Sequence, residues 1–392
     1  MNQQTPFEIY VHVPFCLKRC GYCDFNTYTA TNLGGGVSRS SYADMVIDEL
    51  SLVKIWQEEH GIIEPPAHTI FFGGGTPTIL APEDLVKIVL HIRNTWGIEE
   101  NAEITTEANP DTVDYDYLST LRDGGFNRIS FGMQSAVPHV LRTLDRTHDQ
   151  KNVMLNVKNA QKLNLRSSVD LIYGTPGESL DDWRQSVQAA LDLDVKHISA
   201  YALSLEPTTK MGRMIAAGKL AQTDDDDEAA KYEIADEMFE NAGLRWYEVS
   251  NWSRPGYESE HNLGYWRNVD WAGVGPGAHS HYNRPRIRSW DMHHPKIWGQ
   301  SVQKKTIPWS GSEQLDDTMN LEELAILGLR MREGLNISSF ERTAGQTIPE
   351  VTLAEFVREG LATIENGNIV ATRRGRLLND SMIAQVLAAV GK

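Results

Sequence analysis

The sequence predicts an α/β protein: a partial (β/α)6 barrel, followed by a smaller C-terminal domain that is mostly helical and winged-helix-like. Two observations lead to this expectation. Up to residue 241, short runs rich in β-branched and aromatic residues alternate in strict turn with helical patterns, which is typical of βαβ units and a parallel sheet. Beyond residue 245 that alternation stops, and a stretch rich in Trp, Tyr and Gly leads into further helical patterns.

The strands and helices of the barrel are expected in regular order. Strands are predicted at residues 7–13, 69–72, 103–107, 128–131, 168–172 and 197–205. Helices are predicted at residues 42–58, 83–95, 115–122, 152–163, 180–191 and 228–241. Six such units fit an open or partial barrel better than a closed barrel of eight. The acidic run at 224–228 indicates the solvated start of the last helix, where the helix dipole favours negative charge.

A length of 392 residues suggests one large domain and a smaller one. We expect the large domain to consist of a barrel core and an extension, which gives three parts in all. Residues 1–240 would form the barrel core, and residues 241–310 an extension of it. Residues 311–392 would form the C-terminal domain. The predicted elements of that domain are helices at 321–331, 349–359 and 374–390 and a hairpin around Asn366-Gly367-Asn368.

The composition limits the classes of function. The chain is 41% hydrophobic, and its formal net charge of −16 argues against general nucleic-acid binding, which needs basic surface to neutralise phosphates. No apolar run reaches about 18 residues, so we expect no membrane-spanning helix and at most peripheral membrane contact. The first residues do not resemble a secretory signal. We therefore expect a cytoplasmic protein.

The three cysteines of the chain, Cys16, Cys20 and Cys23, all lie within eight residues. An odd cluster cannot close into disulfides, which favours a reducing compartment and a metal or cluster site. A structural zinc site normally has four protein ligands, and His12 is the one nearby residue that could complete it. A [4Fe–4S] cluster held by three thiolates leaves one iron open for an external ligand, and we favour it over zinc or inert thiols.

Each of the first five predicted strands runs directly into an unusual loop. The first loop carries the cysteines. The others contain Gly73-Gly74-Gly75-Thr76-Pro77, Ala108-Asn109-Pro110, Gly132-Met133-Gln134-Ser135 and Gly174-Thr175-Pro176-Gly177. In a parallel barrel these loops converge on one rim, where ligands bind. The triple glycine lacks the Lys-Ser/Thr of a phosphate-binding P-loop and is expected to let the backbone approach a bound molecule closely.

Together, the cysteine and glycine loops resemble a radical S-adenosylmethionine core. From about residue 7 to residue 330, the chain resembles the oxygen-independent coproporphyrinogen oxidase family in further motifs. These are Tyr10-Val-His-Val-Pro-Phe-Cys16, Glu107-x-Asn-Pro110, Arg128-x-Ser-x-Gly-x-Gln-Ser135 and Asp170-x-Ile-Tyr-Gly-x-Pro-Gly177. The resemblance implies that S-adenosylmethionine binds the open iron through its amino and carboxylate groups. The pocket implied for it consists of Tyr10, Tyr22, Gly74, Gly75, Thr76, Glu107, Gln134, Arg146 and Asp170.

The residue types suit these implied roles. The carboxylates of Glu107 and Asp170, at strand ends, suit an ammonium group or ribose hydroxyls. The guanidinium of Arg146 suits the methionine carboxylate through a bidentate pair, and Tyr22 could pack on the adenine. An ordinary ion pair at the rim is the alternative interpretation of the charged residues.

Two differences separate the chain from the true oxidase. Phe25 stands where the oxidase has an additional cysteine, and Cys16 lies near the start of the sequence, where the oxidase has a long arm. Both match a sister group, the HemW-type haem chaperones. His261-Asn262-Leu263-Gly264-Tyr265-Trp266 also matches the H-N-x-x-Y-W motif of that group, which is associated with haem binding.

The resemblance implies haem as a bound molecule, with His261 as a candidate ligand of its iron. Tyr265 and Trp266 could pack on the flat macrocycle. His279 is another candidate ligand or, equally, part of a barrel-closing turn. Haem propionates could be received by Arg284, Arg286 and Arg288, although that alternation is more typical of one exposed edge of a strand.

Two functions therefore stand open on the sequence. The first is a haem chaperone that carries a [4Fe–4S] cluster with exchangeable S-adenosylmethionine and passes haem to an acceptor protein. The second is a radical enzyme acting on a porphyrin or porphyrinogen, such as an oxygen-independent coproporphyrinogen III oxidase. A binding module with structural zinc does not account for the rim motifs. An electron donor for the cluster is a further expected partner, and the resemblance allows a homodimer.

Replacing any one of Cys16, Cys20 or Cys23 with alanine is predicted to abolish the cluster, because the chain offers no fourth thiolate to take the vacant position. The measurement is iron and acid-labile sulfide content after anaerobic reconstitution, together with visible absorption. A variant that kept full iron and sulfide would show that the ligand assignment is wrong.

Overall fold

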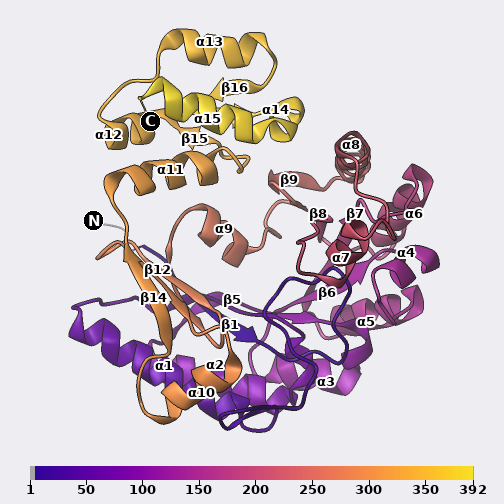
Figure 1. Ribbon diagram of the computed structural model, residues 1–392, viewed down its shortest axis with the longest axis vertical. Coiled ribbons are helices and arrows are strands. Elements are labelled where there is room, and N and C mark those ends of the chain that lie inside the picture. Colours follow the sequence, from indigo (N-terminus) through magenta and orange to yellow (C-terminus); the bar gives the residue numbers. More distant parts are fainter. Residues whose placement is uncertain (1–4, 392) are drawn as a thin grey trace.

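The computed structural model describes residues 5–391, and its frame is one mixed sheet of twelve strands (Figure 1). Six parallel strands form the centre of the sheet, adjacent in the order in which they occur in the chain. They are β1 (Phe7–Val13), β4 (Ala67–Gly74), β5 (Ile98–Ala108), β6 (Arg128–Gln134), β7 (Arg166–Tyr173) and β8 (His197–Ala202). All six predicted strands are therefore confirmed, although β8 ends earlier than expected. The sheet does not close on itself, as expected of a partial barrel.

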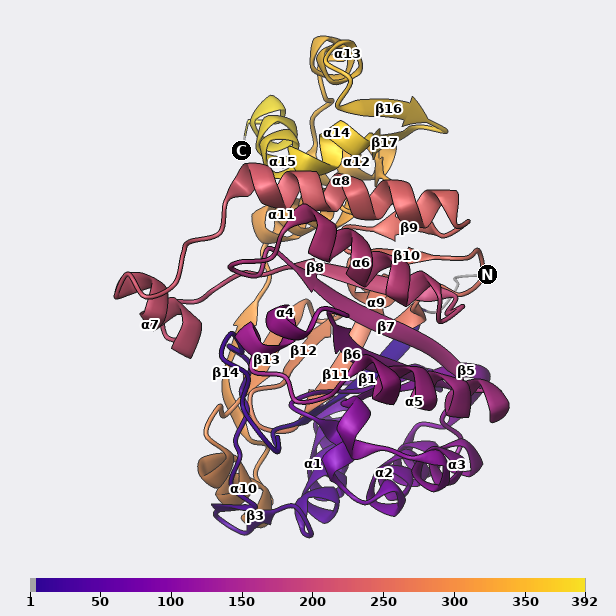
Figure 2. The same ribbon diagram turned by 90° about the vertical axis from the view of Figure 1, so that its right-hand side faces the viewer.

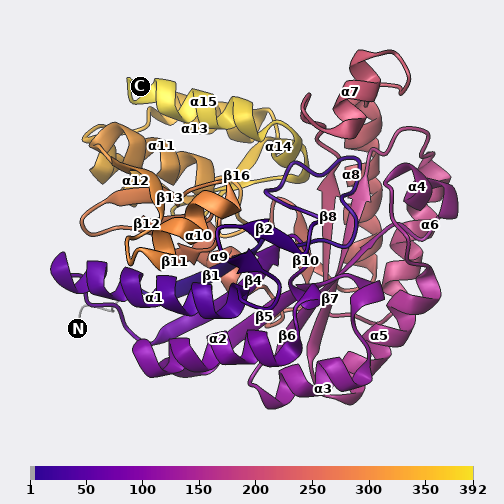
Figure 3. The same ribbon diagram turned by 60° about the horizontal axis from the view of Figure 1, so that its bottom comes forward.

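The predicted helices are also present and lie along the outer side of the parallel strands (Figures 2 and 3). They are α1 (Tyr42–Glu59), α2 (Pro82–Thr95), α3 (Tyr115–Asp123), α5 (Gln150–Lys162), α6 (Leu180–Leu191) and α8 (Asp225–Asn241). The acidic run does begin a helix: the Asp224 carboxylate accepts a hydrogen bond from the backbone N–H of Asp227 and so caps α8. Shorter helices lie in the connections, namely η1 (Pro77–Ile79), η2 (Pro110–Thr112), α4 (Pro138–Thr143) and α7 (Lys210–Ala216). Within residues 5–391, no helix is both long and apolar enough to cross a membrane.

The two faces of the parallel strands differ in chemistry. On β1, the apolar residues Phe7, Ile9, Val11 and Val13 are fully buried in the core formed with the helices. The residues between them, such as Glu8 and Tyr10, face the barrel interior instead. Because successive side chains of a strand point to opposite faces, this alternation makes one side of the sheet apolar and the other polar.

Shorter strands, which were not predicted, extend the sheet at both edges. β11 (Asp270–Val274) pairs in parallel with β1 and is followed by antiparallel β12 (His279–Tyr282), β13 (Ile287–Asp291) and β14 (Trp309–Gln314). At the other edge β10 (Asn251–Ser253) pairs with β8, and β9 (Arg245–Glu248) with β10. A small hairpin of β2 (Asn32–Gly34) and β3 (Val37–Ser38) lies apart from this sheet, and α10 (Pro295–Gln303) connects β13 to β14. These segments lack the regular alternation of strand and helix patterns on which the sequence-based prediction depended.

The helix that carries the H-N-x-x-Y-W motif, α9 (Glu260–Trp266), lies across the amino-terminal ends of the barrel strands and contacts β4. Gly264 makes this possible, because a Cβ atom at that position would lie only 1.9 Å from a carboxylate oxygen of Glu8. The motif therefore forms part of the floor of the barrel.

The C-terminal segment has its own hydrophobic core, above the barrel in Figure 1. It contains α11 (Asp317–Gly328), α12 (Ile337–Ala344), α13 (Glu350–Arg358), α14 (Arg373–Leu377), α15 (Asn379–Ala389) and a sheet of β15 (Leu335–Asn336), β17 (Asn368–Ala371) and β16 (Ala362–Glu365). The hairpin is confirmed, with Asn366 and Gly367 at positive φ as its tight turn requires. The single helix predicted at 374–390 is wrong: the backbone leaves the helical region at Leu378, which separates α14 from α15.

A buried carboxylate joins this segment to the barrel. Asp236, on α8, accepts hydrogen bonds from Arg376 (2.7 Å), Arg373 (2.5 Å) and the indole of Trp252 (2.8 Å). The guanidinium of Arg376 also lies 4.4 Å from the ring centre of Trp246. Burial opposes ionisation of Asp236, but these hydrogen bonds and the two positive charges hold its pKa below the ordinary value.

Replacing Arg376 with alanine is predicted to lower the free energy of unfolding by about 2–3 kcal/mol, because the buried Asp236 keeps only one cationic partner. Urea unfolding measures the change. Arg358→Ala is the matched control, since its ion pairs on α13 are exposed and should contribute less than about 0.5 kcal/mol. Equal effects of the two substitutions would contradict the role given to the Asp236 contact.

Candidate functional site

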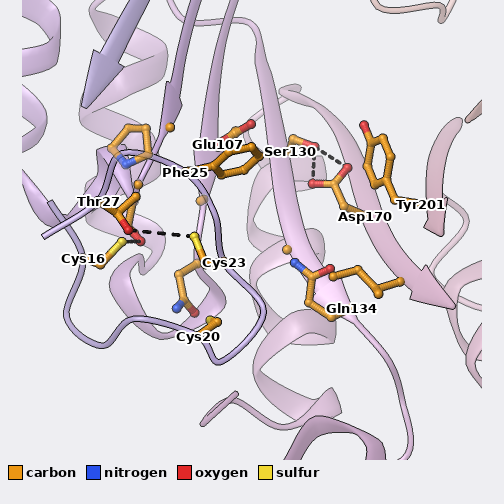
Figure 4. Close-up of a pocket in the computed structure, with 18 of the residues that line it drawn as sticks. Cys16, Cys20, Cys23, Phe25, Thr27, Glu107, Ser130, Gln134, Asp170 and Tyr201 are labelled. Atoms are coloured by element: carbon orange, nitrogen blue, oxygen red, sulfur yellow. Dashed lines mark hydrogen bonds between the residues drawn. The ribbon is translucent and has the colours of Figure 1, made fainter. Parts of the chain in front are cut away.

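The rim loops and the polar inner faces of the strands surround one cavity of about 680 Å³ (Figure 4). The residues predicted to bind the cluster and S-adenosylmethionine line it, together with one haem candidate, His261: Tyr10, Cys16, Cys20, Tyr22, Cys23, Gly74, Gly75, Thr76, Glu107, Gln134, Arg146, Asp170 and His261. These residues come from the loop after β1, from five of the parallel strands or the loops that follow them, and from α9. In Figure 4 the cysteines lie on one side of the cavity and Gln134, Asp170 and Tyr201 on the other.

Each cysteine sulfur has a polar neighbour. The Thr76 hydroxyl donates to Cys16 Sγ (3.7 Å), Arg146 Nη1 donates to Cys20 Sγ (3.7 Å), and Cys23 Sγ lies 3.8 Å from the Thr27 hydroxyl. Burial raises the pKa of the Cys16 and Cys23 thiols. Thiolates at these positions therefore need a bound cation or metal as well as these donors. His12, the alternative zinc ligand, instead contacts the Tyr10 hydroxyl and the Asn26 carbonyl and does not line the cavity.

The triple-glycine loop fits against the cysteine loop. The backbone N–H of Gly75 donates to the Val13 carbonyl, and that of Thr76 to the Phe15 carbonyl, both at 2.8 Å. A Cβ atom on Gly75 would lie 2.6 Å from the Phe15 carbonyl oxygen. The glycines therefore let this loop lie close to the backbone of the cysteine loop, whereas the sequence predicted a close approach to a bound molecule. This contact fixes Thr76 beside Cys16.

Two carboxyl groups that line the cavity, those of Glu107 and Asp170, lie beyond the cluster loop. The Ser130 hydroxyl donates to Asp170, at 2.9 Å and 3.0 Å from its two oxygens, and burial raises the pKa of Asp170 despite hydrogen bonds from Ser199 and Ser130. Burial, with the nearby charge of Asp170, raises the pKa of Glu107 to about 8. Within residues 5–391 neither carboxylate has an ion-pair partner, nor does Arg146, so the rim ion pair considered from the sequence is wrong. An incoming cation would relieve this unfavourable pair of acids.

The floor of the cavity contains His261, whose two ring nitrogens both have protein partners. Nδ1 lies 2.6 Å from the Thr69 hydroxyl and 3.4 Å from a Glu8 oxygen, and Nε2 lies 2.9 Å from the Tyr265 hydroxyl. Burial, reinforced by the charge of Arg128, lowers the pKa of His261 to about 3. The neutral ring therefore could ligate iron only after giving up one of these hydrogen bonds.

The other haem candidates lie elsewhere. Trp266 hydrogen-bonds the buried Glu248 and His279 is exposed, and neither lines the cavity. Arg286 pairs with Asp317, and Arg288 pairs with Glu313 and Glu323. The alternating arginines therefore do not reach into the cavity. Nor do they mark an edge of the sheet, because β13 pairs with β12 on one side and with β14 on the other.

Sequence reasoning gave no role to several cavity residues that lie within the strands themselves. Phe71, Arg128, Ser199 and Tyr201 all line the cavity, yet none stands in a rim loop. One signal in the sequence could have indicated them. Strands of a parallel sheet are usually apolar on both faces, so the alternating polar residues in Arg128-x-Ser130-x-Gly132-x-Gln134 indicate a polar inner face.

Comparisons with known proteins agree with this arrangement. Residues 10–190 match the Radical SAM superfamily, and residues 315–378 match the HemN C-terminal domain. The chain is 41% identical to "Heme chaperone HemW" of Mycobacterium tuberculosis, over 97% of this chain and 95% of that protein. It is 32% identical to the Bacillus subtilis protein of the same name, over 96% and 98% of the two chains.

Two further similarities involve a eukaryotic relative and a solved structure. The chain is 34% identical to the zebrafish "Radical S-adenosyl methionine domain-containing protein 1, mitochondrial", over 95% of this chain and 81% of that one. The structure of coproporphyrinogen III oxidase (HemN) from Escherichia coli, described as a radical SAM enzyme, matches with a TM-score of 0.80. It covers 99% of this chain and 90% of that one at 21% identity, and so shows a common fold.

Replacing Glu107 with glutamine is predicted to stabilise the protein in the absence of ligand, and more so at pH 8 than at pH 5. Between the ordinary pKa of 4.5 and about 8, the folded protein holds a proton that the unfolded chain releases. The free energy of unfolding of the unsubstituted protein therefore falls as the pH rises through this window. Glutamine cannot ionise, so the variant should gain about 1–3 kcal/mol at pH 8.

Urea unfolding at the two pH values measures this difference. Glu100→Gln, at an exposed position on the same strand, is the control and should show no such pH dependence. If Glu107→Gln gave the same change in stability at both pH values, the Glu107 carboxyl would not be a strained acid in the ligand-free protein.

Proposed function

Because this chain belongs to the HemW family of radical SAM proteins, we propose that it binds haem and passes it to an acceptor protein. One observation carries the proposal: the cysteine loop, the residues predicted for S-adenosylmethionine and the H-N-x-x-Y-W helix all meet at the same cavity. The near full-length similarity to two curated haem chaperones supports haem as the molecule that is carried.

We propose that Cys16, Cys20 and Cys23 hold a [4Fe–4S] cluster whose open iron takes the amino and carboxylate groups of S-adenosylmethionine. The donor set fits such a cluster. All three thiols are free, they lie on one loop at the cavity wall, and each sulfur has a polar neighbour at 3.7–3.8 Å. Hydrogen bonds to the sulfurs are one means by which proteins adjust the potential of such clusters.

The number of cysteines fits a cluster better than a structural zinc ion, which normally takes four protein ligands. Among the described residues, no three His, Cys, Asp or Glu side chains come together closely enough to hold one metal ion. In a cluster each thiolate binds its own iron atom, so the three sulfurs need not meet at one point.

The residues around the cluster loop suit the parts of S-adenosylmethionine. Glu107 and Asp170 offer carboxylates to its cationic groups, and Arg146, which is already anchored to the Gly132 carbonyl at 2.9 Å, offers a guanidinium to its carboxylate. Tyr22 lines the same wall between two cluster ligands, where its ring can pack on the adenine.

Partners and compartment are part of the proposal. Three free thiols on an oxidation-sensitive site favour the reducing cytoplasm, and a cluster of this kind needs an electron donor. We propose that the acceptor of haem is a protein.

Phe25 is the feature that most favours a carrier over a porphyrinogen oxidase. It stands at the position of the oxidase's additional cysteine, lines the mouth of the cavity and is 60% exposed. A large apolar ring at that point offers packing area to a flat macrocycle but no thiol chemistry.

The protein, purified anaerobically and with its cluster reconstituted, is predicted to bind about one ferric haem per chain. It should leave coproporphyrinogen III unconverted when given S-adenosylmethionine and a reductant. Absorption titration measures haem binding, and chromatography of the products measures conversion, with the E. coli oxidase as positive control. More than one equivalent of protoporphyrinogen IX per chain, or an absence of saturable haem binding, would contradict the proposal.

A further inference from the structure

The cavity has an inner end to which the residues predicted for S-adenosylmethionine contribute only Tyr10. Arg128 begins β6 and Gln134 ends it, and both line the cavity. At about 3.3 Å per residue, the two positions lie about 20 Å apart along the strand. The loop end, with Gln134, Arg146 and the glycine loop, is assigned above, whereas most of the inner end has no assigned ligand.

The inner end is built mainly from aromatic rings. Tyr10 is in register with Phe71, Phe71 with Thr105, and Thr105 with Arg128, so these residues form one layer across four strands. The Phe71 ring stacks on the His261 ring, with centres 5.0 Å apart and planes within 14°, and on the Tyr10 ring at 6.4 Å and 23°. Together with Tyr265, these rings form a wall that suits a flat, largely apolar ligand.

One cation belongs to this layer. The Arg128 side chain is 96% buried, and its contacts are a hydrogen bond from Nη2 to the Ser168 hydroxyl at 3.1 Å and an approach of Nε to Glu103 at 3.8 Å. Glu103 is shared with Arg166, also at 3.8 Å, so one carboxylate faces two guanidinium groups at more than hydrogen-bond distance.

Arg128 has donors to spare. Within residues 5–391 only its Nη2 donates a hydrogen bond, which leaves Nε and Nη1 without an acceptor. Arg128 also lines the cavity, so a ligand there can supply the missing acceptor. A buried guanidinium with unused donors is most stable when it meets an anion, and a carboxylate matches its planar fork.

We propose that Arg128 binds a carboxylate of the molecule carried in the inner end of the cavity, a haem propionate, while the rings of Tyr10, Phe71 and Tyr265 contact the macrocycle. The inference rests on the proposed function. Arg128 thus takes the role of propionate ligand that the sequence analysis considered for the arginines near β13. Two of those arginines already pair with acidic side chains outside the cavity. The carboxylate of S-adenosylmethionine has the same chemistry, and the experiment below separates the two sources.

The test measures three ligands on two forms of the cluster-loaded protein, with and without Arg128→Gln. The ligands are ferric haem, its dimethyl ester, which lacks both carboxylates, and S-adenosylmethionine. We expect the substitution to weaken haem binding about tenfold and to leave the ester and S-adenosylmethionine within about twofold. The ester should bind the unsubstituted protein about as weakly as haem binds the variant.

Arg166→Gln is the matched control, because it also removes an arginine beside Glu103 but does not line the cavity. It should leave the affinity for all three ligands unchanged. Iron content and melting temperature check the fold of each variant. If Arg128→Gln does not fold, Arg128→Lys replaces it, keeping the charge but losing the fork, and a haem-selective loss of about threefold is expected.

Other outcomes overturn the inference in distinguishable ways. An equal loss for haem and its ester would mean that Arg128 only maintains the cavity. A loss confined to S-adenosylmethionine would assign Arg128 to the methionine carboxylate. If the unsubstituted protein bound neither haem nor the ester, the proposed function itself would fail, and the assignment of Arg128 with it.

Discussion

The polar inner face of the six parallel strands is the constraint on which the rest of the structure depends. A parallel barrel normally fills its interior with branched apolar side chains. Here the interior positions hold Glu8, Thr69, Glu103, Arg128 and His197, all buried. Buried polar groups need partners, so a second layer must lie beneath them. That layer is α9 and its flanks, where Ser259 and His261 contact Glu103, Thr69 and Glu8.

This arrangement explains why the barrel has room for ligands. Since the floor is held by hydrogen bonds between polar groups, the space above it is left open to the carboxyl ends of the strands. The cost appears at Glu107 and Asp170, two buried acids that form no ion pair within residues 5–391. Burial raises the pKa of both, although the charges of Arg128 and Arg146 partly oppose the shift at Asp170. Sites prepared for charged ligands commonly carry such strain, because the ligand supplies the charge that the protein lacks.

The C-terminal segment supports the floor from behind. Arg267, which directly follows α9, pairs with Glu333, and the Asn268 amide donates to Glu323 at 3.2 Å. On the far side Arg373 and Arg376 hold Asp236 of α8, and in Figure 2 α14 lies next to that helix. The small domain thus contacts the barrel both at its floor and at its last helix. The contacts at the floor involve Arg267 and Asn268, the two residues that directly follow α9.

The sequence by itself determined the six β/α units, the clustering of the cysteines and the rim residues of the cavity. Parallel strands bring their carboxyl ends to one edge, so motifs that follow successive strands must converge whatever the details of packing. The edge strands, the break at Leu378 and the depth of the cavity were decided only by the tertiary structure. Alternation along β6 places Arg128 on the polar face of the strand, but only the tertiary structure shows that this face lines the same cavity as Phe71, His261 and Tyr265. His261 shows the same limit: its motif is visible in the sequence, but the partners of its two nitrogens, Thr69 and Tyr265, depend on packing α9 against β4.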